Sequence, residues 1–374
     1  MKKLGIYIHI PFCVQKCLYC DFCSFPGCDG DTVERYVSAL CRDIERQGES
    51  LGSRGVDTVY FGGGTPTLLP ISEFEQIMEA LQKSFRLDPD CSVSSECNPA
   101  TVDLEYLRAL RALGVNRLSI GLQSADGDEL RALGRIHSFE DFKDTFADAR
   151  RAGFEDVSVD LMYGIPMQTV DSFKRTLCRV VDLAPDHISA YGLKVEEGTP
   201  FGRMGKRLVL PDEDEEAEMY IICSEYLRKM GYNKYEISNF AHKGYESRHN
   251  LRYWRGEDYI GLGVSAHSYI DGVRFANSRD IEGYISGADI VCERAEIGAE
   301  EQMTEYVMLR MRLSEGVSEA EFRDRFGIGF FEVYGERLSR YIEGGYVIRE
   351  GDRVAFSDRG FFLSNYILSD ILDF

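Results

Sequence analysis

The sequence has little positive charge for its length. Its 374 residues include 43 lysines and arginines against 63 aspartates and glutamates, which gives a formal net charge of −20. A protein that binds nucleic acid usually carries clustered basic residues, because each phosphate contact needs a cation. The acidic balance therefore argues against a DNA- or RNA-binding protein.

The sequence also lacks a long apolar run. No stretch approaches the ~20 apolar residues that a membrane-spanning helix requires. Residues 4–12 are apolar and follow two lysines, but His9 and Pro11 interrupt them and no small-residue cleavage site follows, so we expect a first strand rather than a secretory signal. The eleven cysteines show no disulfide-like spacing. This usage fits a reducing compartment, and we expect a cytoplasmic protein.

A second close pair of cysteines is missing as well. Cys13, Cys17 and Cys20 form the only close group, with the spacing C-x-x-x-C-x-x-C. Zinc sites usually combine two pairs of ligands, and electron-transfer clusters take four thiolates. Three thiolates fit three corners of a [4Fe–4S] cluster whose fourth iron stays open, with a structural zinc site as the alternative. Cys23 is either a fourth ligand or a residue packed beside the cluster, and we favour the second.

Short β-prone segments alternate with helical patterns in the first half of the chain. The strand-like segments are residues 4–10, 58–61, 92–96, 117–122, 156–162 and 187–193, and the helical patterns between them are residues 71–85, 104–113, 139–152 and 171–183. Such alternation predicts an α/β fold with a parallel sheet. Six strands indicate an open, partial (β/α)6 barrel.

Unusual residues occur where these strands end. The cysteines follow the first strand, residues 62–64 are a glycine run after the second, Glu96 ends the third and Gln123 follows the fourth. Sites in barrels of this kind lie at the carboxyl ends of the strands. Gln123 and Asp160 sit in otherwise apolar strands, where a polar group needs a partner, either a bound ligand or an internal hydrogen bond. The sequence therefore predicts a site at this end of the barrel.

Three regions are expected along the chain. Residues 1–230 form the barrel, residues 231–298 an extension rich in aromatics and glycine, and residues 299–374 a C-terminal domain. The last region contains helical patterns and a hairpin that together resemble a winged-helix α+β domain; they cover residues 303–313, 318–326, 332–343, and 346–348 with 354–356. Because the chain is acidic, we interpret this domain as a lid or docking module.

Taken together, these motifs resemble the radical S-adenosylmethionine (SAM) superfamily, in the branch of oxygen-independent coproporphyrinogen III dehydrogenase and its relatives. The resemblance is carried by Cys13, Cys17, Cys20, Gly62-Gly63-Gly64-Thr65-Pro66, Glu96, Gln123, Arg135 and Asp160. It implies that the methionine part of SAM chelates the open iron. It also implies that an electron from the reduced cluster cleaves SAM into methionine and a 5′-deoxyadenosyl radical.

The resemblance further implies a set of residues that bind SAM. These are Tyr7, Tyr19, Gly63, Gly64, Thr65, Glu96, Gln123, Arg135 and Asp160. Gly63 and Gly64 would let backbone groups approach the methionine ammonium. Glu96 would accept hydrogen bonds from the ribose, and Arg135 would hold the carboxylate. Tyr7 and Tyr19 would pack near the adenine, and the loop at residues 261–263 would close over SAM.

Two features separate this chain from the dehydrogenases of the branch. Phe22 stands where they carry a fourth cysteine, and only twelve residues precede Cys13. The string His249-Asn250-Leu-Arg-Tyr253-Trp254 resembles instead the signature of the HemW-type haem chaperones. His249 is the candidate haem ligand and His267 a second candidate. The other interpretation of His249 is a hydrogen-bonded histidine in a rigid turn.

We therefore expect a haem chaperone that holds a [4Fe–4S] cluster and SAM and lacks coproporphyrinogen dehydrogenase activity. The alternatives are the dehydrogenase itself, by radical decarboxylation, and another radical SAM transferase, such as a methyltransferase, on the same scaffold. Expected partners are haem, recipient haem proteins and a reductant such as a flavodoxin or ferredoxin.

Overall fold

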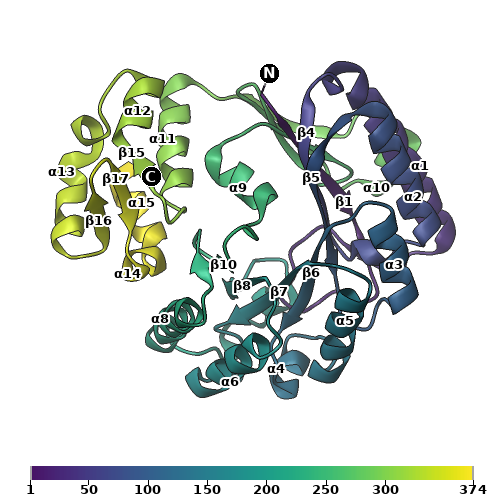
Figure 1. Cartoon of the computed structure of the whole chain (residues 1–374), viewed down its shortest axis with the longest axis horizontal. Coiled ribbons are helices and arrows are strands. Elements are labelled where there is room, and N and C mark those ends of the chain that lie inside the picture. Colours follow the sequence, from purple (N-terminus) through teal and green to yellow (C-terminus); the bar gives the residue numbers. More distant parts are fainter. Residues whose placement is uncertain (1, 373–374) are drawn as a thin grey trace.

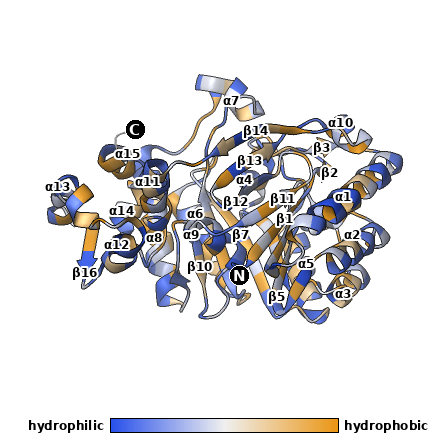
Figure 2. Cartoon of the chain, turned by 90° about the horizontal axis from the view of Figure 1, so that it is seen from above, coloured by the Kyte–Doolittle hydropathy of each residue, from blue (hydrophilic) through white to orange (hydrophobic). Residues whose placement is uncertain are grey.

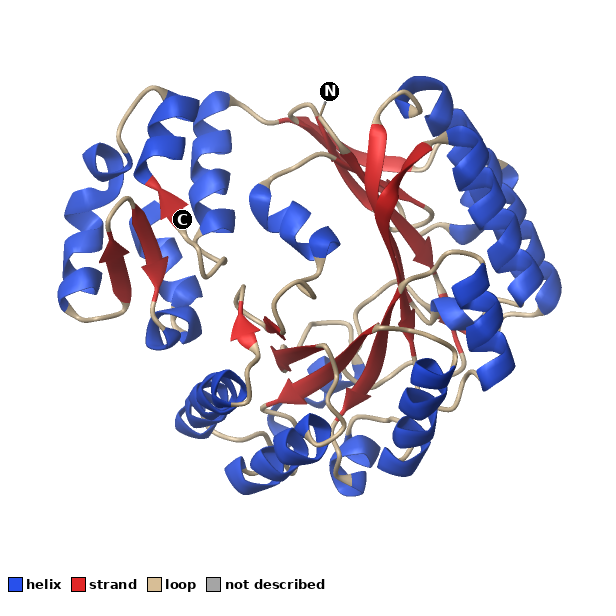
Figure 3. Ribbon diagram, in the orientation of Figure 1, coloured by secondary structure: helices blue, strands red, loops and turns tan. Residues whose placement is uncertain are grey.

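The computed structural model describes residues 2–372 and contains one large, curved sheet (Figure 1, Figure 3). Its centre consists of parallel strands in the order β1, β4, β5, β6, β7, β8. Their bounds are β1 Leu4–Ile10, β4 Gly55–Gly63, β5 Arg86–Cys97, β6 Arg117–Gln123, β7 Asp156–Tyr163 and β8 His187–Gly192. The partial barrel predicted from the alternating pattern is confirmed.

Helices cover the outer face of this sheet (Figure 1). They are α1 Gly30–Leu51, α2 Ile71–Ser84, α3 Leu104–Ala112, α4 Gly127–Ala132, α5 Phe139–Arg151, α6 Val170–Val181 and α8 Glu213–Lys229. Each of the longer ones presents an apolar stripe inward. On α6, for example, Phe173, Leu177 and Val180 share one face and are almost fully buried. Capping boxes at Ser138 and Thr169 fix where α5 and α6 begin.

Residues 231–298 extend the sheet at both of its edges. At one edge β11 (Tyr259–Leu262) pairs parallel with β1, and β12 (His267–Ile270), β13 (Val273–Asn277) and β14 (Val291–Glu296) follow antiparallel. At the other edge β10 (Asn239–Ala241) and β9 (Asn233–Lys234) continue from β8. Helix α10 (Ile281–Ser286) packs against α1. A seventh parallel strand, β11, was not expected from the sequence.

Helix α9 (Arg248–Arg255) lies on the open, concave side of the sheet, where Figure 1 shows it between β10 and β4. Ser247 caps its first turn, and Gly256 ends it with a left-handed φ of 62°. The helix contacts β4 on one side and α11 of the C-terminal region on the other. It therefore closes the barrel from inside and links the barrel to the last part of the chain.

The C-terminal region is a separate α+β unit, as the sequence predicts (Figure 1). Its elements are α11 Ala299–Arg310, β15 Val317–Ser318, α12 Glu319–Phe326, α13 Phe330–Glu343, β16 Val347–Glu350, β17 Arg353–Phe356, α14 Asp358–Phe362 and α15 Ser364–Leu372. Its core includes Phe322, Phe330 and Val354, all fully buried. The predicted hairpin corresponds to β16 and β17.

Loops at the carboxyl ends of the parallel strands carry short elements. After β1 come β2 (Phe12–Cys13) and β3 (Phe25–Pro26), and η1 (Pro66–Leu68) follows β4. After β8 come α7 (Pro200–Met204) and η2 (Gly205–Arg207); Figure 2 shows α7 standing at the periphery of the molecule. No helix within residues 2–372 combines the length and the apolar character needed to cross a bilayer.

Candidate functional site

A cavity of about 770 Å³ opens among the loops at the carboxyl ends of the strands and reaches the barrel interior. This volume is in the range of cofactor pockets. The residues predicted from the sequence that line it are Tyr7, Cys13, Cys17, Tyr19, Cys20, Gly63, Gly64, Thr65, Glu96, Gln123, Arg135 and Asp160. His249 and the loop at residues 261–263, which were also predicted to contact ligands, do not line it.

The cysteine loop forms the outer end of this cavity. Cys13, Cys17 and Cys20 are each partly exposed to it. The loop is fixed to the end of α4, because the Leu18 amide donates to the Leu133 carbonyl at 3.1 Å and Gln15 Nε2 donates to the Gly134 carbonyl at 3.1 Å. The three thiols are therefore held on one ordered turn.

The thiols suit a multi-iron cluster. Within residues 2–372 no three histidine, cysteine or carboxylate side chains are placed to share one metal ion. A cubane cluster takes one thiolate per iron and needs no such convergence. Burial raises the pKa of the Cys13 and Cys20 thiols, so cluster binding would have to displace their protons. Cys23 is only 5% exposed and also lines the cavity.

Arg135 places a positive charge beside these thiols. Its Nη1 lies 3.4 Å from Cys17 Sγ, and its Nη2 donates to Asn98 Oδ1 at 2.6 Å. Burial by itself would lower the pKa of Arg135, but Tyr19 and Cys17 outweigh it and raise this pKa overall. A permanent cation here favours thiolates and would attract the carboxylate of an amino-acid ligand. Its Nε is buried without a partner, so one donor stays available.

The glycine run packs the end of β4 against the cysteine loop. Gly63 has a φ of +110°, and a Cβ there would lie 2.5 Å from the His9 ring. A Cβ on Gly64 would lie 2.5 Å from the Phe12 carbonyl oxygen. The glycines are therefore required for close approach within the protein. Contact between Gly63 or Gly64 and SAM stays a prediction.

Two carboxylates lie deeper in the cavity. Glu96 accepts hydrogen bonds from the Tyr60 hydroxyl at 3.0 Å and the Gly63 amide at 3.2 Å. Burial, and next the charge of Asp160, raise the pKa of Glu96 to about 7. Burial also raises the pKa of Asp160, whose two oxygens each accept from Ser119 Oγ at 3.0 Å. A cationic or hydroxyl-bearing ligand would relieve the repulsion between these carboxylates.

Gln123 is held in an unusual backbone conformation. Its φ is +70°, in the left-handed region, and it lies at an irregularity in the register between β6 and β7. A Cβ added at Gly121 would lie 3.0–3.1 Å from Gln123 Nε2, Arg135 Nη2 and Asn98 Oδ1, so these three polar groups converge. Backbone strain of this kind is often found at functional sites.

His249 faces β4 rather than the cavity. Its Nδ1 is 3.0 Å from Thr58 Oγ1, and its Nε2 is 2.8 Å from the Tyr253 hydroxyl. The side chain is 2% exposed, and burial together with Arg252 lowers its pKa to about 3. Both ring nitrogens have protein partners, so neither is free to bind iron here. The structure favours the hydrogen-bonded histidine over the expected haem ligand.

Other parts of the same motif do reach open space. Asn250 and Tyr253 line the large cavity. Outside the motif, His267, an exposed residue at the start of β12, lines it as well. Trp254 lines a smaller cavity of about 160 Å³, between α9 and the C-terminal region, together with Tyr306. Helix α9 therefore separates two cavities, and Tyr253 borders both.

Sequence reasoning missed several polar residues that line the large cavity. Among them are His9, Tyr60, Asn98, Arg117, Ser119 and His187. His9 lies between Ile8 and Ile10 in a buried strand, a position at which a polar residue needs a partner. Its Nε2 is 2.8 Å from the Cys23 carbonyl oxygen. A histidine between two isoleucines in an apolar strand was the signal that could have identified His9 as a site residue.

Comparisons with known proteins agree with this architecture. The sequence profile of the radical SAM superfamily matches residues 7–179, and that of the HemN C-terminal domain matches residues 297–363. A solved structure, described as coproporphyrinogen III oxidase (HemN) from Escherichia coli, a radical SAM enzyme, superposes with a TM-score of 0.86. It is 23% identical, with 99% of this chain and 90% of that chain covered, and this likeness shows the fold.

Curated relatives match over the full length of the chain. The heme chaperone HemW of Bacillus subtilis (strain 168) is 35% identical, with 98% of each chain covered. The heme chaperone HemW of Escherichia coli (strain K12) is 34% identical, again with 98% of each covered. That of Lactococcus lactis subsp. lactis (strain IL1403) is 32% identical, with 99% of this chain and 98% of the relative covered. The chain belongs to the radical SAM superfamily and, within it, to the family of the heme chaperone HemW proteins.

Proposed function

We propose that this protein is a haem chaperone, which binds haem and passes it to recipient haem proteins, and that it carries a [4Fe–4S] cluster with SAM. The observation that carries the proposal is a sequence identity of 31–35%, over 98–100% of this chain, to proteins named heme chaperone HemW. Similarity of this extent includes the barrel, the extension and the C-terminal region together.

The cavity supports the cluster and SAM part of the proposal. Cys13, Cys17 and Cys20 would hold the cluster, which when reduced supplies one electron for cleavage of the SAM sulfonium. Arg135 would hold the SAM carboxylate close to the thiols. Glu96, which lines the cavity, would accept from the ribose.

For haem, we propose His267 rather than His249 as the iron ligand. His267 is exposed at the edge of the cavity, whereas ligation by His249 would require loss of its bond to Thr58 or to Tyr253. A porphyrin gains most of its affinity by burying its large apolar faces. Removing the ligand should therefore change the spectrum more than the affinity.

A second candidate function is oxidative decarboxylation of coproporphyrinogen III. The fold likeness with a TM-score of 0.86 favours it. Against it stands Phe22, which is 69% exposed at the position where the dehydrogenases carry a fourth cysteine. We therefore propose that this protein lacks that activity.

One anaerobic experiment separates the two functions. The cluster is reconstituted, and either haem or coproporphyrinogen III is added with SAM and a reductant. We expect stoichiometric haem uptake, a Soret shift in His267→Ala but not in His249→Gln, and no protoporphyrinogen IX. Catalytic formation of protoporphyrinogen IX without haem uptake would overturn the proposal.

Location and haem delivery are further parts of the proposal. We propose a cytoplasmic protein, because all eleven cysteines are free thiols. Haem-loaded protein mixed with an apo-haem protein should lose its own spectrum as the recipient's appears. Release no faster than spontaneous haem loss would argue against a chaperone.

A further inference from the structure

The smaller cavity lies between helix α9 and the C-terminal region, and we call it the side pocket. It measures about 160 Å³. A cavity of roughly 150 Å³ can hold a molecule the size of benzene. Its wall comes from α9, from β11, β12 and β13 of the extended sheet, and from α11 and α12. The proposed function assigns nothing to this cavity, so its own residues must indicate what it binds.

Aromatic side chains form much of the wall of the side pocket. They are Tyr253, Trp254, Tyr259, Tyr269 and Tyr306. The guanidinium carbons of Arg310 and Arg325 each lie 5.3 Å from the centre of the Tyr306 ring. A guanidinium group over an aromatic ring can still donate hydrogen bonds from its N–H edges to a planar anion. The wall therefore combines flat apolar surface with cationic donors.

Several hydrogen-bond donors in the side pocket lack a partner. The hydroxyls of Tyr259 and Tyr269 and the guanidinium of Arg325 form no hydrogen bond or ion pair within the part of the chain that the structure describes. Glu305 is the one carboxylate among the described lining residues, and its two oxygens accept from Arg274 at 2.7 and 2.8 Å. The groups left free are therefore donors, so the pocket suits an anion that accepts hydrogen bonds.

The other carboxylates close to the side pocket are shared between arginines. Glu315 lies 3.4 Å from Arg255 and 3.3 Å from Arg310. Glu321 lies 3.3 Å from Arg353 and 3.8 Å from Arg310. Arg310 Nε is nevertheless buried without a partner. These two glutamates thus serve three arginines, which leaves positive charge in excess.

The charges around the side pocket are positive on balance. The arginines are Arg255, Arg274, Arg310, Arg325 and Arg353, and the carboxylates that pair with members of this set are Glu305, Glu315 and Glu321. Glu257 pairs with Arg252, and the exposed Asp324 precedes Arg325 in the chain, but neither carboxylate lines the pocket. Even with Asp324 included, the arginines outnumber the carboxylates. In a chain with a net charge of −20, this local excess favours an anionic ligand.

We propose that the side pocket binds a small planar carboxylate, an aromatic or conjugated acid with a single ring of about the size of benzoate. The carboxylate accepts hydrogen bonds from Arg325 and from the hydroxyls of Tyr259 and Tyr269, and the ring lies against the aromatic wall. This inference goes beyond the proposed function, and it needs neither the cluster nor haem. Such a ligand contacts both α9 and the C-terminal region, so it strengthens the connection between them.

The test uses the full chain and a built-in probe. Trp254, the only tryptophan of the sequence, lines the side pocket, so its fluorescence reports occupancy. The protein is titrated with benzoate, with benzyl alcohol, which has the same ring without the charge, and with inorganic phosphate. Isothermal titration calorimetry gives the dissociation constants. Arg325→Gln removes one charge from the pocket, and the matched control is Arg323→Gln on the same helix, where the side chain pairs with Glu319 and does not line the pocket.

We expect benzoate to change the fluorescence of Trp254 and to bind about tenfold or more tightly than benzyl alcohol or phosphate, because only benzoate uses both the donors and the rings. Arg325→Gln should weaken benzoate binding about tenfold, since a hydrogen bond to a charged group is lost, and Arg323→Gln less than about twofold. Tyr259→Phe, which removes only a hydroxyl, should weaken it about threefold or more. Circular dichroism shows that each variant is folded.

Three results would overturn the proposal. The first is no benzoate binding by the unaltered protein, which would show that the pocket is not a ligand site. The second is equal affinity for benzoate, benzyl alcohol and phosphate, which would show that the donors and rings do not act together. The third is equal weakening by Arg325→Gln and Arg323→Gln, which would place benzoate outside the side pocket.

Discussion

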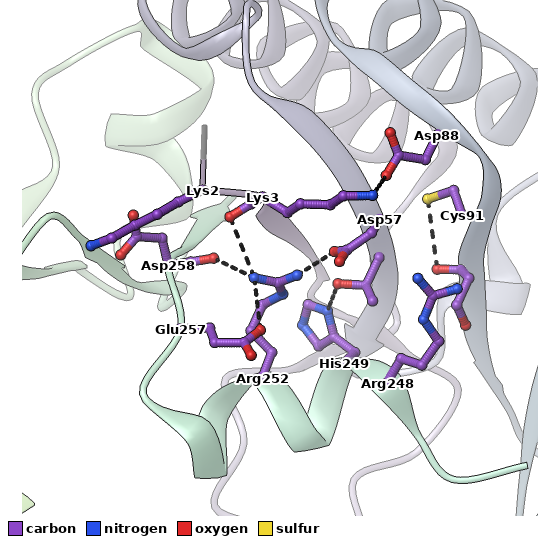
Figure 4. A network of polar contacts seen from close by, with 12 residues as sticks. Lys2, Lys3, Asp57, Asp88, Cys91, Arg248, His249, Arg252, Glu257 and Asp258 are labelled. Atoms are coloured by element: carbon purple, nitrogen blue, oxygen red, sulfur yellow. Dashed lines mark hydrogen bonds and ion pairs between the residues drawn. The ribbon is translucent and has the colours of Figure 1, made fainter. Parts of the chain in front are cut away.

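The cysteine loop, which we call the outer end, and helix α9 where it packs on β4, which we call the inner end, are built in different ways. At the outer end, Cys13, Cys17 and Cys20 are partly exposed thiols on a loop, beside the guanidinium of Arg135. At the inner end, helix α9 holds His249 and Arg252, whose polar atoms are largely paired with β4 and the amino-terminal residues (Figure 4). The thiols at the outer end are therefore accessible to ligands, whereas most polar groups of His249 and Arg252 at the inner end already bond to other parts of the protein.

Arg252 shows how the inner end is stabilised. It forms ion pairs with Asp57 and Glu257, and its Nη1 donates to the Asp258 carbonyl at 3.2 Å (Figure 4). The side chain is 3% exposed. A string of polar residues can therefore serve the architecture of the barrel, while the residues predicted to bind ligands lie on the loops opposite. The following predictions test this division.

The largest effect is expected at the thiols. Replacing Cys13, Cys17 or Cys20 by alanine should remove most reconstituted iron and sulfide, because each thiolate holds one iron. Cys23→Ala, in the same loop, should retain both, as measured by iron and sulfide analysis. Equal loss in Cys23→Ala would show that four thiolates are needed, and stoichiometric zinc in anaerobically purified protein would favour the zinc alternative.

At the inner end, Arg252→Ala should lower the free energy of unfolding by about 3–5 kcal/mol, because it leaves Asp57, whose side chain is only 17% exposed, without its partner. The matched control is Arg248→Ala on the same helix, where a side chain 41% exposed pairs with Asp90. Its removal should cost less than about 1 kcal/mol. Urea unfolding followed by circular dichroism measures both. Similar losses in the free energy of unfolding for the two variants would contradict a particular role of Arg252 in stabilising the inner end.

At the outer end, Arg135→Ala should weaken SAM binding about ten- to a hundredfold, since a charge-assisted contact contributes roughly 1.5–3 kcal/mol. Arg131→Ala, an exposed arginine on α4 paired with Asp128, should leave SAM binding unchanged. Binding is measured by titration and by the electron paramagnetic resonance spectrum of the reduced cluster. A spectrum that SAM does not alter in the unaltered protein would contradict chelation of the open iron.

The effect that is smallest per unit of changed condition is a dependence of stability on pH. The pKa of His249 falls from 6.5 to about 3 on folding, because burial disfavours the charged ring. The unfolded chain therefore binds more protons below pH 6.5, and stability is lost as the pH falls toward 3. This histidine contributes a slope of up to about 1.4 kcal/mol per pH unit. His249→Gln should reduce the slope of the free energy of unfolding against pH, measured in a series of urea unfolding curves.

Much of the outer end could be predicted because its signals are local. The spacing of the cysteines is set along one turn, and parallel strands bring their carboxyl ends to one edge, so Glu96, Gln123 and Asp160 had to gather near the loop after β1. The same reasoning could not find the seventh parallel strand. β11 is four residues long and pairs with β1, more than 240 residues earlier in the chain.

The role of His249 shows the same limit at the level of one side chain. The sequence placed a histidine among aromatics, which suits either a haem ligand or a structural histidine. Its hydrogen-bond partner Thr58 is 191 residues away, and no local pattern indicates that contact. His267, which the structure leaves open at the cavity edge, has the weaker sequence signal.

By itself, the sequence of this protein determined the α/β class, the alternation of strands and helices along residues 4–193 and the three clustered thiols, because these depend on periodicity and on spacing within short segments. Only the tertiary structure decided which polar groups are paired and which remain free for ligands. Pairing depends on which distant segments meet, as α9 meets β4 and α7 meets the cysteine loop. Those contacts form only when the whole chain is packed, so no short segment of the sequence specifies them.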